Sequence, residues 1–340
     1  MVNSTNSKRE PKSKTINLVR NWLPVPKSTR FSRMDKGYAS SNWIFGYNNS
    51  RYILKRFMDW KKRSDIEKEY ELTNYVMKSG FPYEVPEMLP AKNGKPYIEN
   101  EGALYSMYRF ILGNADLPIT KKDAYEIGSM DAQLHDIFEK KRFESSRREG
   151  YQTLENIKAR LHDTYEKALH KTGKEDRAFI AAYKFFAPLL NGMDLSYYET
   201  LKSYPVHFDI AADNLLWRNG RIYALIDFAN IANYRDALLM DLAWAIHFCA
   251  VNKKTRASYN KILLKALIDG YTDKRSLSKE DAQALPSLLA ITNASETEFF
   301  YNSSRKTPDQ KAIKIKSQIK LTKWALRNKG YFLKMSLSHG

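Results

Sequence analysis

The segment 205–228 carries three side chains whose types and spacing suit the transfer of a phosphoryl group. Asp209 follows His207 by two residues, Asn214 comes five residues later, and Asp227 ends the next apolar run. Phosphoryl transfer to an alcohol needs a carboxylate that orients the hydroxyl and accepts its proton, and oxygen ligands that hold magnesium on the phosphates. The spacing predicts Asp209 as the base and Asn214 and Asp227 as Mg²⁺ ligands, with Asn214 also closing the loop. Each residue alone is typical of a turn or a strand end, but the three together at this spacing favour a catalytic role over a purely structural one.

A second group of residues, nearer the N-terminus, suits nucleotide binding. Lys55 lies in a β-prone run and Glu69 lies in the helical pattern that follows, an order that suits a lysine on the phosphates and a glutamate that pairs with it. Glu67 and Glu71 are close enough in sequence that the pairing residue stays open. The segment 36–42 precedes the first strand, and we expect its backbone N–H groups to face phosphate. Its candidate residues are Gly37, Ser40 and Ser41.

The elements that must position these residues fall into two parts. Up to about residue 110 the pattern is strand-like with one helix: β-prone runs flank a turn signal at 48–50, and Ser64 is placed to cap a helix that stops at Gly80. From about residue 121 onward helical periodicity dominates, interrupted once at 204–234 by two short β-prone runs. The expected helices are 121–140, 150–171, 175–190, 236–251, 256–271, 279–302 and 309–329.

This pattern predicts an α+β fold with two lobes. A disordered tail over 1–14 would precede an N-terminal nucleotide-binding lobe over 15–111. A helical C-terminal lobe over 112–335 would carry the catalytic loop 205–228.

Several stretches follow the pattern of one known family, and the loop 207–214 is the most specific of them. The others include Gly37 to Asn42 with Tyr52 to Lys55, and the ranges 127–135, 226–228 and 236–243. Over about residues 30–300 the chain therefore resembles the aminoglycoside phosphotransferase and choline kinase-like superfamily, with homoserine kinases loosely nearest. The resemblance implies a two-lobed protein kinase-like fold with ATP and Mg²⁺ in the cleft, and a small-molecule alcohol (an aminoglycoside, choline, homoserine or a similar compound) as the other partner.

The resemblance also implies roles for particular residues. Lys55 and Glu69 would form the phosphate clamp, and Asp209 would be the base. The strand through Arg109 would form the hinge that contacts the nucleotide. The hinge residues implied to contact it are Tyr105, Met107 and Tyr108.

Phe208 departs from the family pattern, which usually has glycine between the catalytic histidine and aspartate. Phenylalanine rarely adopts positive φ, so we expect the loop either to use an ordinary backbone conformation or to be altered. An altered loop would leave a catalytically weak, kinase-like ATP-binding module as an alternative function. A protein Ser/Thr kinase is a further alternative, disfavoured because a helix begins about ten residues after Asp227 and leaves no room for an activation segment.

The overall charge raises the question of nucleic acid. In 340 residues, 56 Lys and Arg against 38 Asp and Glu give +18, a charge that attracts polyanions at low salt. The run 305–334 is strongly basic, but its interleaved apolar residues favour a helix with one packed face, and no nucleic-acid-binding module is recognisable. The polar N-terminus, the single cysteine Cys249 and the lack of a bilayer-length apolar run predict a cytoplasmic protein without a membrane partner. The oligomeric state is left open.

The acceptor is not specified by any motif. Ser295–Glu298, with the aromatic residues that follow, would offer acids to a cationic amine, but a solvated helix start is the interpretation we favour. His135 and His207 are interpreted as structural rather than metal-binding, His135 at a helix end and His207 fixing the loop. Asp241 is expected to be a buried acceptor that ties the catalytic loop to the helix behind it.

Overall fold

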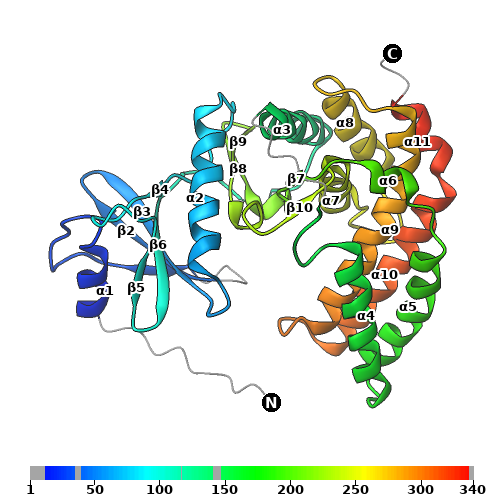
Figure 1. Cartoon of the computed structure of the whole chain (residues 1–340), viewed down its shortest axis with the longest axis horizontal. Helices are drawn as coiled ribbons and strands as arrows, with labels where there is room; N and C mark the ends of the chain where they lie inside the picture. Colours follow the sequence, from blue (N-terminus) through cyan, green and yellow to red (C-terminus); the bar gives the residue numbers. More distant parts are fainter. Residues whose placement is uncertain (1–11, 35–39, 116, 141–146, 337–340) are drawn as a thin grey trace. The chain divides into compact units, whose positions relative to one another are not determined.

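The computed structural model describes residues 12–34, 40–115, 117–140 and 147–336, and the chain divides into two compact units. Unit 1 comprises Met1–Lys78 and Glu84–Leu112, and unit 2 comprises Ser79–Tyr83 and Gly113–Gly340. An antiparallel sheet dominates unit 1 and helices dominate unit 2 (Figure 1), so the predicted α+β kinase-like fold is confirmed. Helix α1 (Lys12–Val19) begins inside the segment expected to be a tail, and residues 1–11 lie outside the described part.

The sheet of unit 1 has the strand order β1, β2, β3, β6, β4, with β5 also paired to β6. The strands are β1 (Ser32–Met34), β2 (Ser40–Tyr47), β3 (Ser50–Phe57), β4 (Met88–Leu89), β5 (Ile98–Asn100) and β6 (Ala103–Arg109). The predicted hairpin joins β2 to β3 through Asn48 and Asn49, whose φ angles are 48° and 58°. Asparagine tolerates this left-handed conformation, and two such residues make the turn that matches the twist of paired strands.

Two helices cover opposite faces of this sheet (Figure 1). The side chains of α1 pack with Leu54 and Met107, whereas α2 (Arg63–Lys78) packs with Phe57 and Tyr108. Successive side chains of a strand point to opposite faces, so β3 and β6 supply both cores. Helix α2 starts one residue before Ser64, and the carboxylate of Asp65 accepts the N–H of Lys62 at 3.1 Å, so Ser64 is not the cap.

Unit 2 has nine α-helices among the described residues. They are α3 (Lys121–Lys140), α4 (Leu154–Leu169), α5 (Lys174–Asn191), α6 (Ser196–Thr200), α7 (Leu238–Ala250), α8 (Lys261–Thr272), α9 (Lys279–Asn302), α10 (Pro308–Arg327) and α11 (Lys329–Ser336). Helices α3 and α8 cross closely because Gly128 and Gly270 lie at the crossing: a Cβ on Gly270 would meet the carbonyl oxygen of Tyr125 at 1.9 Å. This close crossing brings α8 side chains against the buried face of α3.

Four short strands of unit 2 frame the predicted catalytic loop. The pairs are β7 (Tyr204–Pro205) with β10 (Arg235–Asp236) and β8 (Leu215–Arg218) with β9 (Arg221–Leu225). The loop from β7 to β8 contains Asp209 and Asn214, and the turn after β9 contains Asp227. The pairing of β7 with β10 thus fixes the start of the loop that contains Asp209 and Asn214, and the pairing of β8 with β9 fixes its end.

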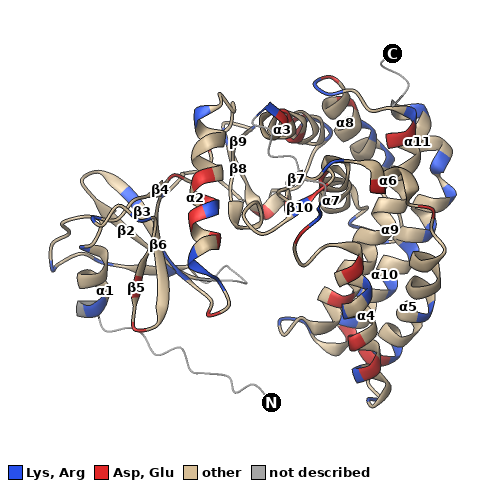
Figure 2. Cartoon of the chain, viewed as in Figure 1, with Lys and Arg blue, Asp and Glu red and all other residues tan. Residues whose placement is uncertain are grey.

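Basic residues are spread over the helices of both units (Figure 2). In α10 an apolar stripe that includes Ile315 and Leu321 is buried, as expected for the basic C-terminal segment. Lys314 is half-buried and its ammonium lies 5.1 Å from the centre of the Phe300 ring. In the described part of the chain, no helix has both the length and the apolar character that crossing a membrane requires.

Candidate active site

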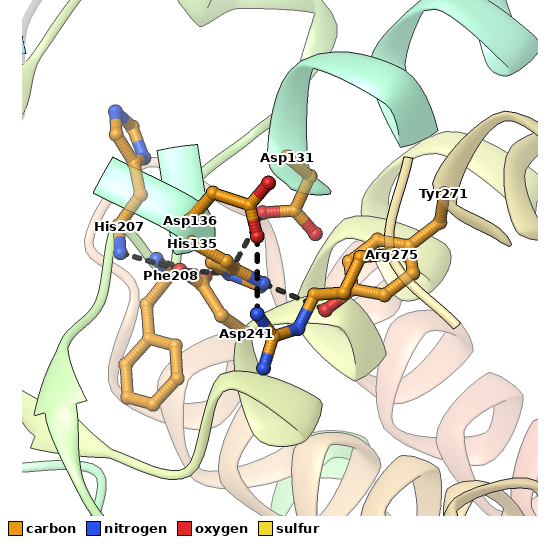
Figure 3. Close-up of polar contacts among 8 residues, drawn as sticks. All are labelled: Asp131, His135, Asp136, His207, Phe208, Asp241, Tyr271 and Arg275. Atoms are coloured by element: carbon orange, nitrogen blue, oxygen red, sulfur yellow. Dashed lines mark hydrogen bonds and ion pairs between the residues drawn. The ribbon is translucent and has the colours of Figure 1, made fainter. Parts of the chain in front are cut away.

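A single buried carboxylate on α7 holds the backbone of the predicted catalytic loop. Asp241 accepts the backbone N–H of His207 on Oδ2 and that of Phe208 on Oδ1, both at 2.7 Å (Figure 3). The expectation that Asp241 ties the loop to the helix behind it is confirmed. Hydrogen bonds to a carboxylate are stronger than neutral ones, so the two residues before Asp209 are fixed firmly.

Phe208 adopts the left-handed conformation that the sequence made improbable for this residue type. Its φ is 56°, so the loop does not take an ordinary backbone conformation at this residue. The left-handed bend that a glycine would make here is present with a phenylalanine. The buried ring packs 5.8 Å from Tyr234 and 5.9 Å from Trp244, centre to centre. The two hydrogen bonds of Asp241 and this packing offset the cost of a left-handed residue with a side chain, which is about 1–2 kcal/mol.

Asp241 is supported from the other side by a buried histidine. Nε2 of His135 lies 3.0 Å from Asp131 and 3.4 Å from Asp241, and Nδ1 lies 2.9 Å from the hydroxyl of Tyr271 (Figure 3). Helix α3 continues to Lys140, so the expectation that His135 ends a helix is wrong. Burial opposes a charge on the ring, but Asp131, Tyr271 and the hydrogen bonds to the two carboxylates raise the pKa of His135 well above its ordinary value.

The same three residues have the donor types of a metal site. Oxygen and nitrogen atoms of Asp131, His135 and Asp241 lie within 4.8 Å of one another. Both ring nitrogens of His135 are already engaged, however, Nδ1 by the hydroxyl of Tyr271 and Nε2 by the carboxylates. These contacts support a structural role for the cluster, and the structural role expected for His135 stays a prediction.

Asp209 and Asn214 are in direct contact. Nδ2 of Asn214 donates to the carbonyl oxygen of Asp209 at 2.9 Å and to its Oδ2 at 2.7 Å. Burial, followed by the charges of Asp227 and Asp213, raises the pKa of Asp209 to about 7, although the bond from Asn214 opposes the shift. A carboxylate with a pKa near neutrality is suited to accept a proton at physiological pH.

Asp227 lies in the turn after β9, where its φ is 62° and the residue is exposed. Its charge acts on Asp209, which means that two carboxylates lie within electrostatic reach of each other. The amide nitrogen of Asn214 donates its hydrogen bond to Asp209. The amide oxygen of Asn214 is the atom that can coordinate a cation. Carboxylate and amide oxygens are the donors that Mg²⁺ prefers, so the residues present fit a divalent cation.

In unit 1, Glu69 is buried, with 2% of its surface exposed, whereas its neighbours Glu67 and Glu71 are exposed. Glu69 accepts a hydrogen bond from the hydroxyl of Tyr108 at 2.8 Å and lies 3.6 Å from Nζ of Lys61. Burial and the nearby Lys55 lower the pKa of Lys61, and Glu69 opposes the shift. Of the three glutamates whose role was open, Glu69 is thus the buried one, and it lies beside a tyrosine hydroxyl and a lysine.

Lys61 has a buried position that the sequence does not indicate. It belongs to the basic run 61–63, and no pattern indicates which of three adjacent basic residues turns inward. Lys55, the lysine that was predicted, has its ammonium 5.3 Å from the ring centre of Phe57 and 5.7 Å from that of Tyr108. Both lysines therefore lie near the Tyr108 and Glu69 pair.

The remaining nucleotide candidates belong to the segment before and within β2 and to β6. Gly37 lies outside the described residues, Ser40 begins β2, and Ser41 lies opposite Arg56 in the ladder. Tyr105, Met107 and Tyr108 lie in β6, which pairs with β3 on one edge and with β4 and β5 on the other.

Two of the three expected hinge residues have side chains in the core of the sheet. Tyr105 is 2% exposed and Met107 is 0% exposed, both in the core shared with α1. The side chains of Tyr105 and Met107 therefore contribute to the sheet core, and the contact of the hinge residues with a nucleotide stays a prediction.

The acidic segment Ser295–Glu298 lies well inside α9, and all four residues are buried. The favoured interpretation as a solvated helix start is therefore wrong. Periodicity alone did not reveal this, because α9 is buried on several sides by other helices of unit 2.

Comparison with known proteins extends over most of the chain. The model of the phosphotransferase enzyme family matches residues 30–277. A homoserine kinase of Agrobacterium fabrum is 24% identical over 276 residues, which are 79% of this chain and 80% of the relative. The fold is shared by the solved structure of a microcompartment-associated aminopropanol kinase, with a TM-score of 0.68 and 16% identity over 94% of this chain and 98% of that one. It is also shared by an amicoumacin kinase in complex with AMP-PNP, Ca²⁺ and Ami, with a TM-score of 0.66 and 14% identity over 92% of this chain and 93% of that one.

Proposed function

The chain belongs to the phosphotransferase enzyme family, and we propose that this small-molecule kinase transfers the γ-phosphate of ATP to the hydroxyl of a small alcohol, with L-homoserine as the first candidate. The observation that carries the proposal is the contact between Asp209 and Asn214 in a loop whose backbone is fixed by Asp241. Homoserine is chosen because similar curated proteins are homoserine kinases.

Asp209 is the base in this proposal. Its carboxylate orients the acceptor hydroxyl and takes the proton as the hydroxyl oxygen bonds to the γ-phosphorus and the bond to the departing ADP oxygen breaks. The hydrogen bond from Asn214 fixes the rotamer of Asp209, so the accepting oxygen is held in place before the substrate arrives.

Asn214 and Asp227 hold Mg²⁺ in this proposal, consistent with their oxygen donors. The cation, when bound, neutralises the phosphate oxygens as charge develops on them. In unit 1, Lys55 is the phosphate ligand, and Glu69, fixed by Tyr108 and Lys61, orients it. The left-handed backbone at Phe208 supports the kinase over the alternative of a catalytically weak binding module, because the phenylalanine keeps the positive φ that a glycine there would adopt.

The Asp209→Asn variant tests the proposal. Phosphate transfer to L-homoserine, 3-amino-1-propanol, choline and an aminoglycoside would be measured, together with ATP binding by calorimetry. We expect kcat to fall by about 10²- to 10⁴-fold, the range for loss of a general base, with ATP affinity nearly unchanged. The matched control is Asp213→Asn, which removes one charge from an exposed residue of the same loop. Unchanged transfer by a folded, ATP-binding Asp209→Asn variant would remove Asp209 from the mechanism.

A further inference from the structure

The outer face of helix α10 carries a row of basic side chains. From residue 316 onward its exposed positions recur every three or four residues, which is the spacing of one face of a helix. The opposite face, with Ile315 and Leu321, is buried in unit 2. After Asp309 the sequence has no acidic residue, so no later residue of the chain can neutralise the row. The members of the row are Lys316, Lys320, Lys323 and Arg327.

The row destabilises the helix that carries it. Side chains three or four residues apart on a helix are neighbours, so each successive pair in the row brings two like charges together. Surface helices commonly place an acid at this spacing, as in α8, where Nζ of Lys265 lies 2.7 Å from Asp269. In the described part of the chain, Lys316, Lys320 and Arg327 form no ion pair. An anionic partner would relieve the repulsion.

Helix α5 lies beside α10 and runs in the same direction (Figure 1). Near the start of both helices, Nζ of Lys174 lies 2.9 Å from Oδ1 of Asp309. Further along both, Nζ of Lys323 lies 5.3 Å from the centre of the Phe185 ring. The outer faces of the two helices therefore form one continuous side of unit 2.

The outer face of α5 adds further cations to this side. Its exposed positions include Arg177 and Lys184 and no acidic residue. Of the exposed residues that the structure describes on the two helices, only Asp309 is acidic, and Lys174 neutralises it. Exposed acidic residues lie instead on α4 (Figure 2). The remaining cations, which we call the basic surface, are Arg177, Lys184, Lys316, Lys320, Lys323 and Arg327.

The make-up of the basic surface favours a phosphate backbone over other polyanions. A helix that lies on a membrane needs an apolar face beside its charges, and a protein interface needs apolar or aromatic anchors. In the described part of α5 and α10, the one large apolar side chain that is exposed is Ile313, which precedes the row. Single-stranded nucleic acid is bound on exposed aromatic rings, which the described residues of these two helices do not present. A duplex is attracted by cations alone.

We propose that the basic surface binds the phosphate backbone of a nucleic-acid duplex without reading its sequence. Lys316 and Arg327 lie about 16 Å apart along the helix axis, and one strand of a duplex places a phosphate about every 3.4 Å along its own axis. The row alone thus spans about five phosphates. Contacts to phosphate carry no sequence information, so no recognition module is required. The inference is independent of the proposed reaction.

The test measures the binding of a fluorescent DNA duplex of about 24 base pairs, by anisotropy, at several salt concentrations. For wild type, the cations of the basic surface predict that the logarithm of the association constant falls with that of the salt concentration with a slope of about −5. Replacing the four residues of the row by glutamine should change the slope to about −2 and weaken binding at low salt about tenfold or more. Duplexes of unrelated sequence should bind equally.

A charge-matched variant separates the basic surface from the net charge of +18. Lys68, Lys92, Lys121 and Lys122 are exposed on other elements, and replacing all four by glutamine removes the same charge. This control should keep the affinity and the slope close to those of wild type. Urea unfolding checks that both variants are folded, and the row variant should be at least as stable as wild type because the repulsion along α10 is removed.

A wild type that does not bind the duplex at low salt, or an equal loss of affinity in the two variants, would overturn the inference. Vesicles of anionic phospholipid are the competing probe. If wild type bound them more tightly than the duplex, the partner would be a membrane surface and the inference would also fail. Loss of duplex binding in the row variant alone, with weak binding to the vesicles, is the expected result.

Discussion

Phe208 donates its backbone N–H to Oδ1 of Asp241 at 2.7 Å while its φ lies at 56°. The two residues are 33 positions apart in sequence, and their contact fixes a strained bend immediately before the candidate base. A residue with a side chain keeps such a conformation only where the surroundings hold it. The bend is therefore a property of the packed helix α7 as much as of the loop.

The strain at Phe208 predicts an unusual order of stabilities. Phe208→Ala loses the ring packing and keeps the left-handed backbone, whereas Phe208→Gly loses the same packing and relieves the strain. We expect the glycine variant to be more stable than the alanine variant by about 1 kcal/mol in urea unfolding. At an ordinary loop position the entropy of glycine reverses this order, so an alanine variant that is equal or more stable would show that the bend is unstrained.

The buried His135 predicts a pH-dependent stability. Its pKa is raised on folding, so its contribution is fully present below the unfolded value of about 6.5 and is lost as pH rises through the folded pKa. His135→Gln should cost about 3 kcal/mol near pH 6, because it leaves the carboxylates of Asp131 and Asp241 buried without their cation. The difference between wild type and variant, measured by urea unfolding from pH 6 to 9, should shrink with rising pH. A constant difference would mean that the ring is neutral in the folded protein.

The assignment of Asp227 as a metal ligand predicts a specific loss of activity. Asp227→Ala should lower phosphate transfer by about 10²-fold or more, since the cation would lose its carboxylate ligand. Asp213→Ala removes an exposed carboxylate from the loop between β7 and β8 and should leave the dependence on Mg²⁺ concentration unchanged. Wild-type rates in Asp227→Ala at saturating Mg²⁺ would exclude Asp227 from the cation site.

The two lysines of unit 1 should respond differently to replacement by methionine. Lys55→Met should raise KM for ATP about tenfold or more with little change in stability, because Lys55 is proposed to act on the phosphates. Lys61→Met should mainly lower the free energy of unfolding, by about 3 kcal/mol, since Glu69 would lose the cation beside it in a site where both side chains are 3% exposed. The reverse pattern in the two assays would exchange the roles of the two lysines.

Sequence alone predicted the features that depend on neighbouring residues. The turn at Asn48 and Asn49, the helix over 121–140 and the strands on either side of residues 219–220 follow from local conformational preference and periodicity. The contact of Asp209 with Asn214 belongs to the same class, because a spacing of five residues within one loop brings the two side chains together. The geometry of such short segments depends mainly on neighbouring residues, so it can be predicted from the sequence.

Tertiary structure decided what depends on residues far apart in sequence. His135 meets Tyr271, 136 residues away, only because two glycines allow α3 and α8 to cross closely. Lys61 is buried beside Glu69, which in turn accepts a hydrogen bond from Tyr108, a residue 47 positions away from Lys61. Glu296 is removed from solvent by helices that surround α9, although its sequence context resembles an exposed helix start. Burial and pKa are set by the atoms that packing brings within a few ångströms, and the polar groups of unit 2 acquire their chemistry from that packing rather than from their place in the chain.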